Sequence, residues 1–279
     1  MSLPVVELRQ VDYHYPDGTQ ALRGVHLQVE RGCNLALLGP NGAGKSSLLM
    51  HLNGILRPRR GEIFLEGDPV SYSRKFLKRW RAHVGLVFQN PDDQLFAPSV
   101  LEEISFGPLN LGLSRQDVQQ RVASVMAQLG LQSLAHRPPH MLSLGQKKRV
   151  AIAGIVAMRP SVLMLDEPTA GLDREGVERL SETLSQLKKD GCTVVLSTHN
   201  VDFAYAWAER VALFCKGEIP RQGRADTLLT DADAMQSSGL SLPSVWQIMQ
   251  ALGVDQDSDR LQPRNHAQLL DRCRLIRSK

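Results

Sequence analysis

The chain has 279 residues, of which 42% are hydrophobic and 22% are charged, and its formal net charge is +4. This composition is typical of a globular protein with one large domain, or with a domain and an appendage. The sequence has no apolar run of about 18 residues, which argues against a transmembrane helix, and a mild basic excess with 5% aromatic residues does not favour nucleic-acid binding.

The first fifty residues predict strands that lead to a glycine-rich loop. Residues 5–30 have the apolar spacing of short strands, with a turn at 16–18. The apolar run at 33–38 predicts a buried strand. The loop Gly39–Ser46, with the sequence GPNGAGKS, follows it, and a helix opens at 47–52. A strand, this loop pattern and a helix form a phosphate-binding loop, which predicts that the chain binds a nucleoside triphosphate.

The residues of this phosphate loop are suited to holding phosphate groups. Its glycines let the backbone N–H groups point inward, and the following helix adds the positive end of its dipole. Lys45 supplies a positive charge for the β- and γ-phosphates, and the Ser46 hydroxyl is a ligand for Mg²⁺. The residues predicted to contact the nucleotide here are Gly39, Pro40, Asn41, Gly42, Ala43, Gly44, Lys45, Ser46 and Ser47.

The rest of the chain predicts two α/β parts with a helical insert between them. Strands are expected at 61–67 and 84–88, and helical spacing dominates from about 90 to 158. Towards the C-terminus the periodicity weakens, which indicates a small appendage. The predicted domains are therefore 1–222 and 223–279.

A second apolar strand, at 162–165, ends in the acids Asp166 and Glu167. A carboxylate at a strand end near a phosphate loop positions Mg²⁺, and we expect Asp166 to do so together with Ser46. Glu167 is placed to polarise a water molecule for attack on the γ-phosphate. Alone, this pattern would indicate only a surface turn. With the phosphate loop upstream, it predicts hydrolysis of the triphosphate.

The segment Leu142–Gln146 precedes that strand and opens a helix from 147 to about 158. A Ser-x-Gly-Gln segment at a helix N-terminus is a site for an anion. The chain therefore has two phosphate-binding helix ends, at Lys45 and at Ser143. If the two ends cannot reach one nucleotide within one chain, two chains related by a two-fold axis can bring them together. We therefore expect a homodimer.

These residues together resemble the motifs of the ATP-binding-cassette (ABC) ATPases over about residues 5–222. The phosphate loop is similar to the Walker A motif of that family, Val162–Glu167 to Walker B with its catalytic glutamate, and Leu142–Gln146 to the signature segment. The resemblance implies an α/β P-loop NTPase fold with a RecA-like core, N-terminal antiparallel strands and a helical subdomain. It also implies ATP hydrolysis, with ATP and Mg²⁺ bound.

Four more residues acquire roles from that resemblance. Gln89 matches the Q-loop glutamine, which touches Mg²⁺ and senses a transmembrane partner, and His199 matches the switch histidine, which contacts the γ-phosphate. Tyr15 matches the aromatic residue that stacks on adenine, with Tyr13 as a weaker candidate. Asp173 lies in a segment similar to the D-loop. The resemblance implies that the catalytic residues are Glu167, His199 and Gln89, and that the further ATP contacts are Gln89, Asp166, Glu167 and His199. It implies Ser46, Gln89 and Asp166 as the Mg²⁺ ligands. The contacts that it implies from the second chain are Ser143, Gly145, Gln146 and Asp173.

One position departs from the family pattern. The third residue of the signature segment is Leu144, where the family usually has glycine. A leucine removes backbone freedom beside the expected anion. We therefore expect a modest loss of affinity when two chains close on ATP, and not an inactive protein.

Three functions compete: the energy-supplying subunit of a membrane importer, a soluble non-transport cassette protein acting on ribosomes or DNA, and an unrelated phosphate-loop kinase. The ordered signature, D-loop and switch segments disfavour a kinase. Ribosome-acting relatives carry two cassettes, whereas this chain shows one Walker A motif. DNA-repair relatives carry a long coiled coil, and no sustained heptad appears at 90–158. We therefore favour an importer subunit, peripheral on the cytoplasmic face of the cell membrane.

The segment Phe88–Gly107 resembles the ATPases of energy-coupling-factor importers, in which it receives a coupling helix of the transmembrane subunit. A substrate-binding membrane subunit is then an indirect partner. The predicted surface has two kinds of side chain, suited to a basic amphipathic helix. The acidic rim is Asp92, Asp93, Glu102 and Glu103, and the apolar anchors are Leu95, Phe96 and Phe106.

Residues 240–248 resemble the appended dimerisation region of the same group. The expected anchors of a contact between two copies are Trp246, Val245, Ile248 and Met249. Within the group, the ATPases of cobalt importers are the most similar, and nickel and vitamin importers are the alternatives. The substrate does not touch this subunit, so this choice rests on overall similarity.

Overall fold

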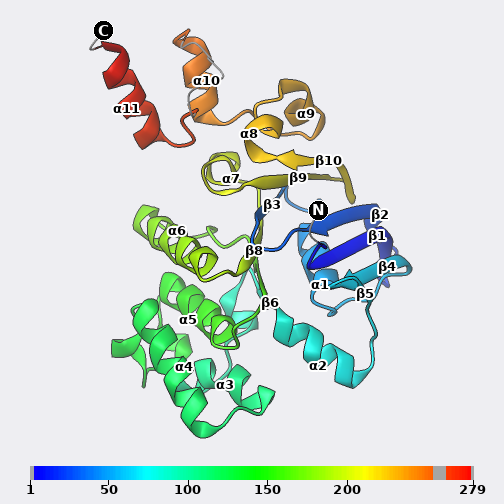
Figure 1. Ribbon diagram of the computed structural model, residues 1–279, viewed down its shortest axis with the longest axis vertical. Helices are drawn as coiled ribbons and strands as arrows, with labels where there is room; N and C mark the ends of the chain where they lie inside the picture. The colour runs from blue at the N-terminus through cyan, green and yellow to red at the C-terminus, as the bar shows by residue number, and fades with distance from the viewer. Residues whose placement is uncertain (1–2, 254–261, 278–279) are drawn as a thin grey trace.

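The computed structural model describes residues 3–253 and 262–277, which form two sheets with helices around them (Figure 1). An antiparallel sheet has the strand order β2-β1-β4-β5, and a six-stranded sheet has the order β10-β9-β3-β8-β7-β6. The strands of the first sheet are β1 (Val6–His14), β2 (Gln20–Val29), β4 (Arg60–Leu65) and β5 (Asp68–Pro69). The strands of the second are β3 (Asn34–Leu38), β6 (Val84–Val87), β7 (Val162–Asp166), β8 (Thr193–Thr198), β9 (Arg210–Cys215) and β10 (Glu218–Arg224).

Helices occupy the predicted insert, where α3, α4 and α5 lie together at the lower end of Figure 1. Ser114 caps α4, because its hydroxyl accepts a hydrogen bond from the Asp117 N–H at 3.1 Å. Helix α2 was not predicted; only Trp80 of this basic helix is buried. The α-helices are α1 (Lys45–Leu52), α2 (Arg74–His83), α3 (Val100–Leu111), α4 (Arg115–Gln128), α5 (Leu144–Val156), α6 (Arg174–Lys189), α7 (Val201–Trp207), α8 (Ala225–Leu228), α9 (Ala232–Ser237), α10 (Ser244–Ala251) and α11 (His266–Arg277), and the 3₁₀ helices are η1 (Pro91–Asp93), η2 (Gln132–Leu134) and η3 (Pro139–Met141).

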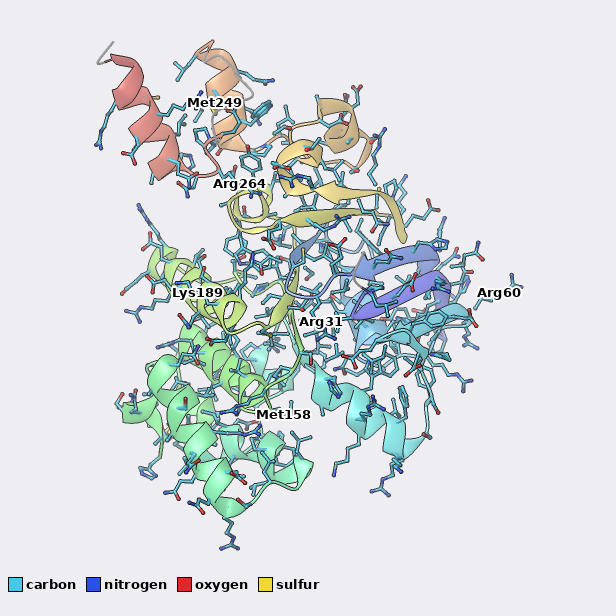
Figure 2. All side chains as sticks on the ribbon, viewed as in Figure 1. Arg31, Arg60, Met158, Lys189, Met249 and Arg264 are labelled. Atoms are coloured by element: carbon cyan, nitrogen blue, oxygen red, sulfur yellow. The ribbon has the colours of Figure 1, made fainter. Side chains whose placement is uncertain are left out.

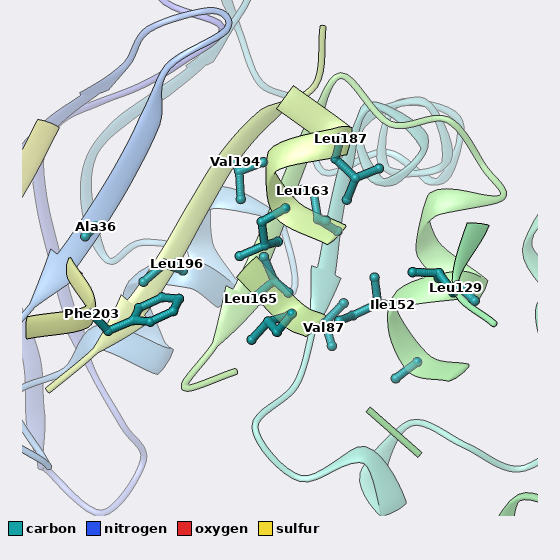
Figure 3. Packing of buried hydrophobic residues seen from close by; sticks show 14 of the residues in the cluster. Ala36, Val87, Leu129, Ile152, Leu163, Leu165, Leu187, Val194, Leu196 and Phe203 are labelled. Carbon is teal, nitrogen blue, oxygen red and sulfur yellow. The ribbon is translucent and has the colours of Figure 1, made fainter. Parts of the chain in front are cut away.

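The central strands are buried on both faces, and alternate residues enter two different cores. Ala36 and Leu38 of β3 join the core on the side of the helical insert, whereas Leu35 and Leu37 join the core beneath the antiparallel sheet. Figure 3 shows side chains of β7 and β8, among them Leu165, meeting residues from the surrounding helices in the first core. Both faces of the sheet are therefore held by packing.

The strand order brings four chain segments to one edge. Strands β3, β8, β7 and β6 are neighbours and run parallel. In the register of these pairs, Leu38 lies opposite Thr198, and Asp166 lies opposite Ser197. The carboxyl ends of parallel strands are where open α/β sheets bind ligands. The loops after these four strands are therefore the first place to seek a site.

Helices α10 and α11 of the C-terminal appendage have a small core of their own, whereas Ala225 of α8 and Met235 of α9 belong to the core on the side of the helical insert. Val245 and Met249 of α10 are buried against Leu269 of α11. Two of the predicted dimer anchors, Val245 and Met249, therefore face inside their own chain, and that part of the prediction was wrong. Ile248 remains exposed, as do Leu252 and Leu270.

Arg264 ties this appendage to the rest of the chain at the junction seen in Figure 2. Its Nη2 donates a hydrogen bond to the Ala208 carbonyl at 2.6 Å, and its guanidinium lies over the Tyr205 ring, 5.4 Å from the centroid. The Ser244 N–H also donates to the Asp202 carboxylate at 2.6 Å. These contacts attach the appendage at α7.

A buried histidine supports the helix that follows the phosphate loop. His51 of α1 is fully buried, its Nδ1 donates to the Ser47 carbonyl at 2.7 Å, and its ring packs edge-to-face on Tyr13. Burial lowers the pKa of His51 to about 4. The folded chain therefore keeps this side chain neutral under conditions in which the unfolded chain takes up a proton.

We predict that stability falls as the pH is lowered from about 6.5, the ordinary pKa of histidine, towards the folded pKa of His51. Above this window His51 is neutral in both the folded and the unfolded chain. Within the window only the unfolded chain binds the proton, which lowers the free energy of unfolding by up to about 3 kcal/mol. Urea unfolding at pH 7.5 and pH 5 measures the change. A His51→Phe variant should lose less stability between these values, and the exposed His26→Phe should behave as wild type. Equal losses in wild type and His51→Phe would contradict the assignment.

Candidate functional site

The phosphate loop connects β3 to α1, and close backbone approaches shape it. A Cβ atom on Gly39 would lie 2.1 Å from the carbonyl oxygen of Phe214, and one on Gly44 would lie 2.4 Å from that of Ala21. Gly44 also has φ +110°, and it is the N-cap of α1. Only glycine fits these two positions. The loop therefore curls tightly at the positive end of the α1 dipole.

Lys45 lies inside this loop, and Glu167 lies beside it. The Lys45 Nζ donates to the carbonyls of Gly39 and Pro40 at 2.7 and 3.1 Å. It also lies 3.3 Å from Glu167 Oε1, an ion pair without hydrogen-bond alignment. The other oxygen, Glu167 Oε2, is 3.0 Å from the Nδ1 of His199. Three predicted residues, which follow strands β3, β7 and β8 in the chain, therefore meet at one carboxylate.

The backbone at Glu167 is strained. Its φ is +43°, a left-handed conformation that residues other than glycine rarely adopt. Its N–H donates to the side chain of Ser197 at 3.0 Å and to the carbonyl of the same residue at 3.2 Å. The Ser197 hydroxyl in turn donates to the Asp166 carboxylate. Strain that surrounding contacts maintain is frequent at functional sites. Ser197 was not predicted, because a serine within a buried strand carries no distinct sequence signal.

A pocket of about 290 Å³ collects most of the predicted nucleotide contacts. The Tyr15 hydroxyl is 2.9 Å from Ser47 Oγ, and the ring of Tyr13 packs edge-on behind Tyr15. Tyr15 therefore faces the pocket and Tyr13 supports it. Predicted residues lining the pocket are Tyr15, Asn41, Gly42, Gly44, Lys45, Ser46, Ser47, Gln89, Asp166 and Glu167; unpredicted ones are Thr19, Gln20 and Ala21, which follow the predicted turn at 16–18.

The same pocket contains the oxygen donors expected for Mg²⁺. Ser46, Gln89 and Asp166 all line it, although they come from three separate segments. Hydroxyl, amide and carboxylate oxygens suit this hard cation. These residues therefore fit the metal. In the part of the chain that the structure describes, no group of three or more His, Cys, Asp or Glu side chains is arranged to hold a metal ion.

The residues predicted to act on a second chain's nucleotide line a different pocket, of about 420 Å³. They are Ser143, Gly145, Gln146 and Asp173. Ser143 Oγ accepts from the Gln146 N–H at 3.3 Å, and Gln146 Oε1 accepts from the Ser143 N–H at 2.9 Å. Asp173 accepts from the Gly176 N–H at 2.8 Å. These side chains cap α5 and α6, and none of them lines the pocket of Lys45.

Leu144, the departure from the family pattern, lies against the D-loop segment. Its Cδ2 is 2.6 Å from the position that a Cβ on Gly171 would take. The side chain is 41% exposed. The leucine therefore fills the space above this glycine and joins the start of α5 to the loop after β7. Its expected effect on closure remains a prediction.

A groove of about 1110 Å³ lies beside the segment after Gln89. Its lining includes the exposed Phe96 and Phe106, whose rings meet edge-to-face with centroids 4.8 Å apart, and Leu95. Residues of α2, among them Lys78, form another part of the lining. The three predicted apolar anchors thus share one groove.

The predicted acidic rim is only partly present. Glu103 is 7% exposed, and its Oε2 accepts hydrogen bonds from the N–H groups of Phe96 and Ala97 at 2.9 and 2.7 Å. The prediction was wrong for Glu103, because the carboxylate satisfies buried backbone donors. Asp92 is exposed but pairs with Lys147 Nζ at 2.6 Å.

Comparison with known proteins identifies several similar to this chain. The ABC transporter family model matches residues 22–170. The energy-coupling factor transporter ATP-binding protein EcfA of Methanocaldococcus jannaschii is 47% identical over 89% of both chains. The cobalt import ATP-binding protein CbiO of Rhodobacter capsulatus is 52% identical over 87% of this chain and 86% of its own.

Two solved structures are also similar. One is cbiO1 of Clostridium perfringens, described as part of the ABC transporter complex cbiONQ; it has a TM-score of 0.76 and 38% identity, covering 89% of this chain and all of its own. The other is a dimeric bacterial ABC transporter cassette, MJ0796, with a TM-score of 0.71 and 28% identity over 79% of this chain and 98% of its own.

Proposed function

The chain belongs to the ABC transporter family and, within it, to the ATP-binding proteins of energy-coupling factor importers, and from this premise we propose that it powers the import of cobalt ions. It is an ABC ATPase, which binds and hydrolyses ATP. Similarity to a cobalt import protein supports the metal ion as the transported substrate. Other relatives are named only as energy-coupling factor proteins, with no substrate, so importers of nickel and of vitamins are the alternatives. A non-transport cassette protein is the alternative of another class.

The observation that carries the proposed mechanism is the position of Glu167 between Lys45 and His199. Phosphates of ATP on the loop attract the Lys45 ammonium away from Glu167, because they carry the greater negative charge. The freed carboxylate then accepts a proton from the attacking water, and His199 orients the carboxylate and steadies the γ-phosphate. Tyr15 stacks on the adenine. Mg²⁺, when bound by Ser46, Gln89 and Asp166, supplies positive charge beside the phosphates.

We propose that the active form is a homodimer. The capped end of α5 and the phosphate loop line separate pockets of one chain. A two-fold axis would bring Ser143, Gly145 and Gln146 of one copy to the nucleotide of the other, with Asp173 beside them. The similar dimeric cassette supports this arrangement.

We predict that Glu167→Gln abolishes most ATP hydrolysis and traps an ATP-bound dimer. The amide keeps the shape of the carboxylate but cannot accept the proton, and a lost catalytic base costs about 100-fold or more in kcat. Phosphate release measures hydrolysis, and sedimentation with ATP measures the dimer. Exposed Glu182→Gln is the control. A Glu167→Gln chain that stays monomeric with ATP and hydrolyses normally would exclude both the dimer and the assigned base.

We propose that the groove beside Gln89 receives a helix of a transmembrane subunit. Its exposed phenylalanines supply the apolar contacts that carry this proposal. The exposed acids Asp93 and Glu102 are not part of the groove lining, whereas basic residues of α2, among them Lys78, are. Among the described helices, none is long and apolar enough to cross a bilayer. A peripheral position on the cytoplasmic face, with the substrate-binding subunit touched only indirectly, agrees with this proposal.

Phe106→Glu should detach the chain from its membrane partner without reducing its own ATPase rate. Burying a carboxylate in an apolar contact is costly, and Phe106 lies outside the pocket of Lys45. Co-purification from membranes, followed by metal uptake into vesicles bearing the purified complex, tests the partner and the ion together. The exposed Ile55→Glu is the control. Undiminished co-purification with Phe106→Glu would reject the groove, and uptake of Ni²⁺ in preference to Co²⁺ would reject cobalt.

We propose that residues 223–279 strengthen the contact between two copies. Ile248 of α10 and Leu252, the residue that follows this helix, are exposed although the other apolar face of α10 is buried, and Leu270 of α11 is exposed as well. Exposed apolar side chains favour association when a partner covers them.

Replacing both Ile248 and Leu252 with glutamate should therefore weaken dimerisation in the absence of ATP by about 10-fold or more. Sedimentation over a range of concentrations gives the dissociation constant. Gln250→Glu, which adds a charge to the same helix, is the matched control. An unchanged dissociation constant in the double variant would reject this role for the appendage.

A further inference from the structure

A buried lysine on α5 contacts the backbone after β7. Lys148 is 7% exposed, and its Nζ donates to the carbonyls of Ala170, Pro168 and Glu167 at 2.6, 3.0 and 3.3 Å. A lysine ammonium has three donors, and these three carbonyls match them. The contacts thus hold three of the four residues in segment 167–170 around one positive charge.

Burying this ammonium has a cost. An ammonium is strongly hydrated in water, and three carbonyl dipoles replace that hydration only in part. Burial lowers the pKa of Lys148, while the negative charge of Glu167 acts in the opposite direction. An apolar side chain of similar length, such as methionine, would fill the space without desolvating a charge. The position of a lysine here therefore points to a role beyond packing.

The contacted backbone is the strained one. The N–H of Glu167 is held by Ser197, and its carbonyl accepts from Lys148 and from the Ala170 N–H at 3.1 Å. Both polar groups of this left-handed residue are thereby fixed. Its carboxylate then points to Lys45 and His199. Without the lysine, one side of the peptide unit after Glu167 would lose its charged partner, and the strained conformation would lose support.

We propose that Lys148 is a positioning residue for ATP hydrolysis, which holds the backbone from Glu167 to Ala170 so that the Glu167 carboxylate faces the phosphate loop. This inference rests on the proposed role of Glu167 as the base. The same helix begins with the signature segment, and Leu144 lies over Gly171. Helix α5 thus contacts the loop after β7 at two points. The N-terminus of α5, which in the proposed dimer contacts the nucleotide of the second chain, is thereby joined to the loop after β7, which contacts the nucleotide of the same chain.

The test is the full-length Lys148→Met chain, compared with Lys189→Met, which removes the same charge from an exposed site on α6 (Figure 2). We expect kcat to fall about 10- to 100-fold in Lys148→Met, because a small misplacement of a catalytic group costs that much. ATP affinity should stay within about twofold, because the phosphate loop is untouched. Lys189→Met should match wild type. A kcat within about twofold of wild type for Lys148→Met would overturn the inference.

A double-mutant cycle separates positioning from simple destabilisation. If Lys148 acts through Glu167, adding Lys148→Met to Glu167→Gln should not lower the residual rate further. Losses that multiply would overturn the inference, as would a parallel loss of ATP affinity and melting temperature. If Lys148→Met does not fold, Lys148→Gln, which keeps two N–H donors, takes its place in the cycle. Full activity of Glu167→Gln alone would instead refute the proposed base and leave the proposed function to be revised.

Discussion

The parallel pairing of β3, β8, β7 and β6 is the constraint on which the site depends. Each strand ends at the same edge of the sheet, and each is followed by one component: Gly39 after β3, His199 after β8, Glu167 after β7 and Gln89 after β6. The components lie far apart in the sequence, so only this strand order brings them together. Packing on both faces fixes the register, because a slip of one residue would exchange the two cores.

Electrostatics then give the edge its chemistry. Lys45 and Glu167 form a buried ion pair, and a buried pair gains little stability, because desolvation offsets the attraction. In the proposed mechanism, the two groups of this pair are held ready for other partners: the ammonium for phosphate oxygens, and the carboxylate for a water. Low exposure strengthens both interactions. The strained backbone at Glu167 also points to a functional role, because folding alone would favour a relaxed conformation there.

The sequence predicts those parts of the site that are contiguous. The phosphate loop and the Asp166–Glu167 strand end are read directly from neighbouring residues, and alternating or continuous apolar runs locate the strands that carry them. Contacts to the backbone cannot be read in this way. Glu103 looks like a surface acid, and Lys148 like a surface base, because their partners are amide and carbonyl groups that every residue has. Helix α2 is not predicted for another reason: most of its residues are basic or exposed, and its one buried residue, Trp80, gives no apolar periodicity.

The proposed dimer divides the site between two copies, and such a site needs a firm connection within each copy between the residues that serve the partner's nucleotide and those that serve its own. Helix α5 meets this need. Its N-terminus carries Ser143, its first turn places Leu144 over Gly171, and its second turn sends Lys148 to the carbonyls beside Glu167. In the proposed dimer, movement of the signature segment during closure would therefore shift the loop after β7 in the same chain. A glycine at position 144 would leave this connection to the lysine alone. The leucine is therefore consistent with an active enzyme, because it adds a contact within the chain where it removes backbone freedom.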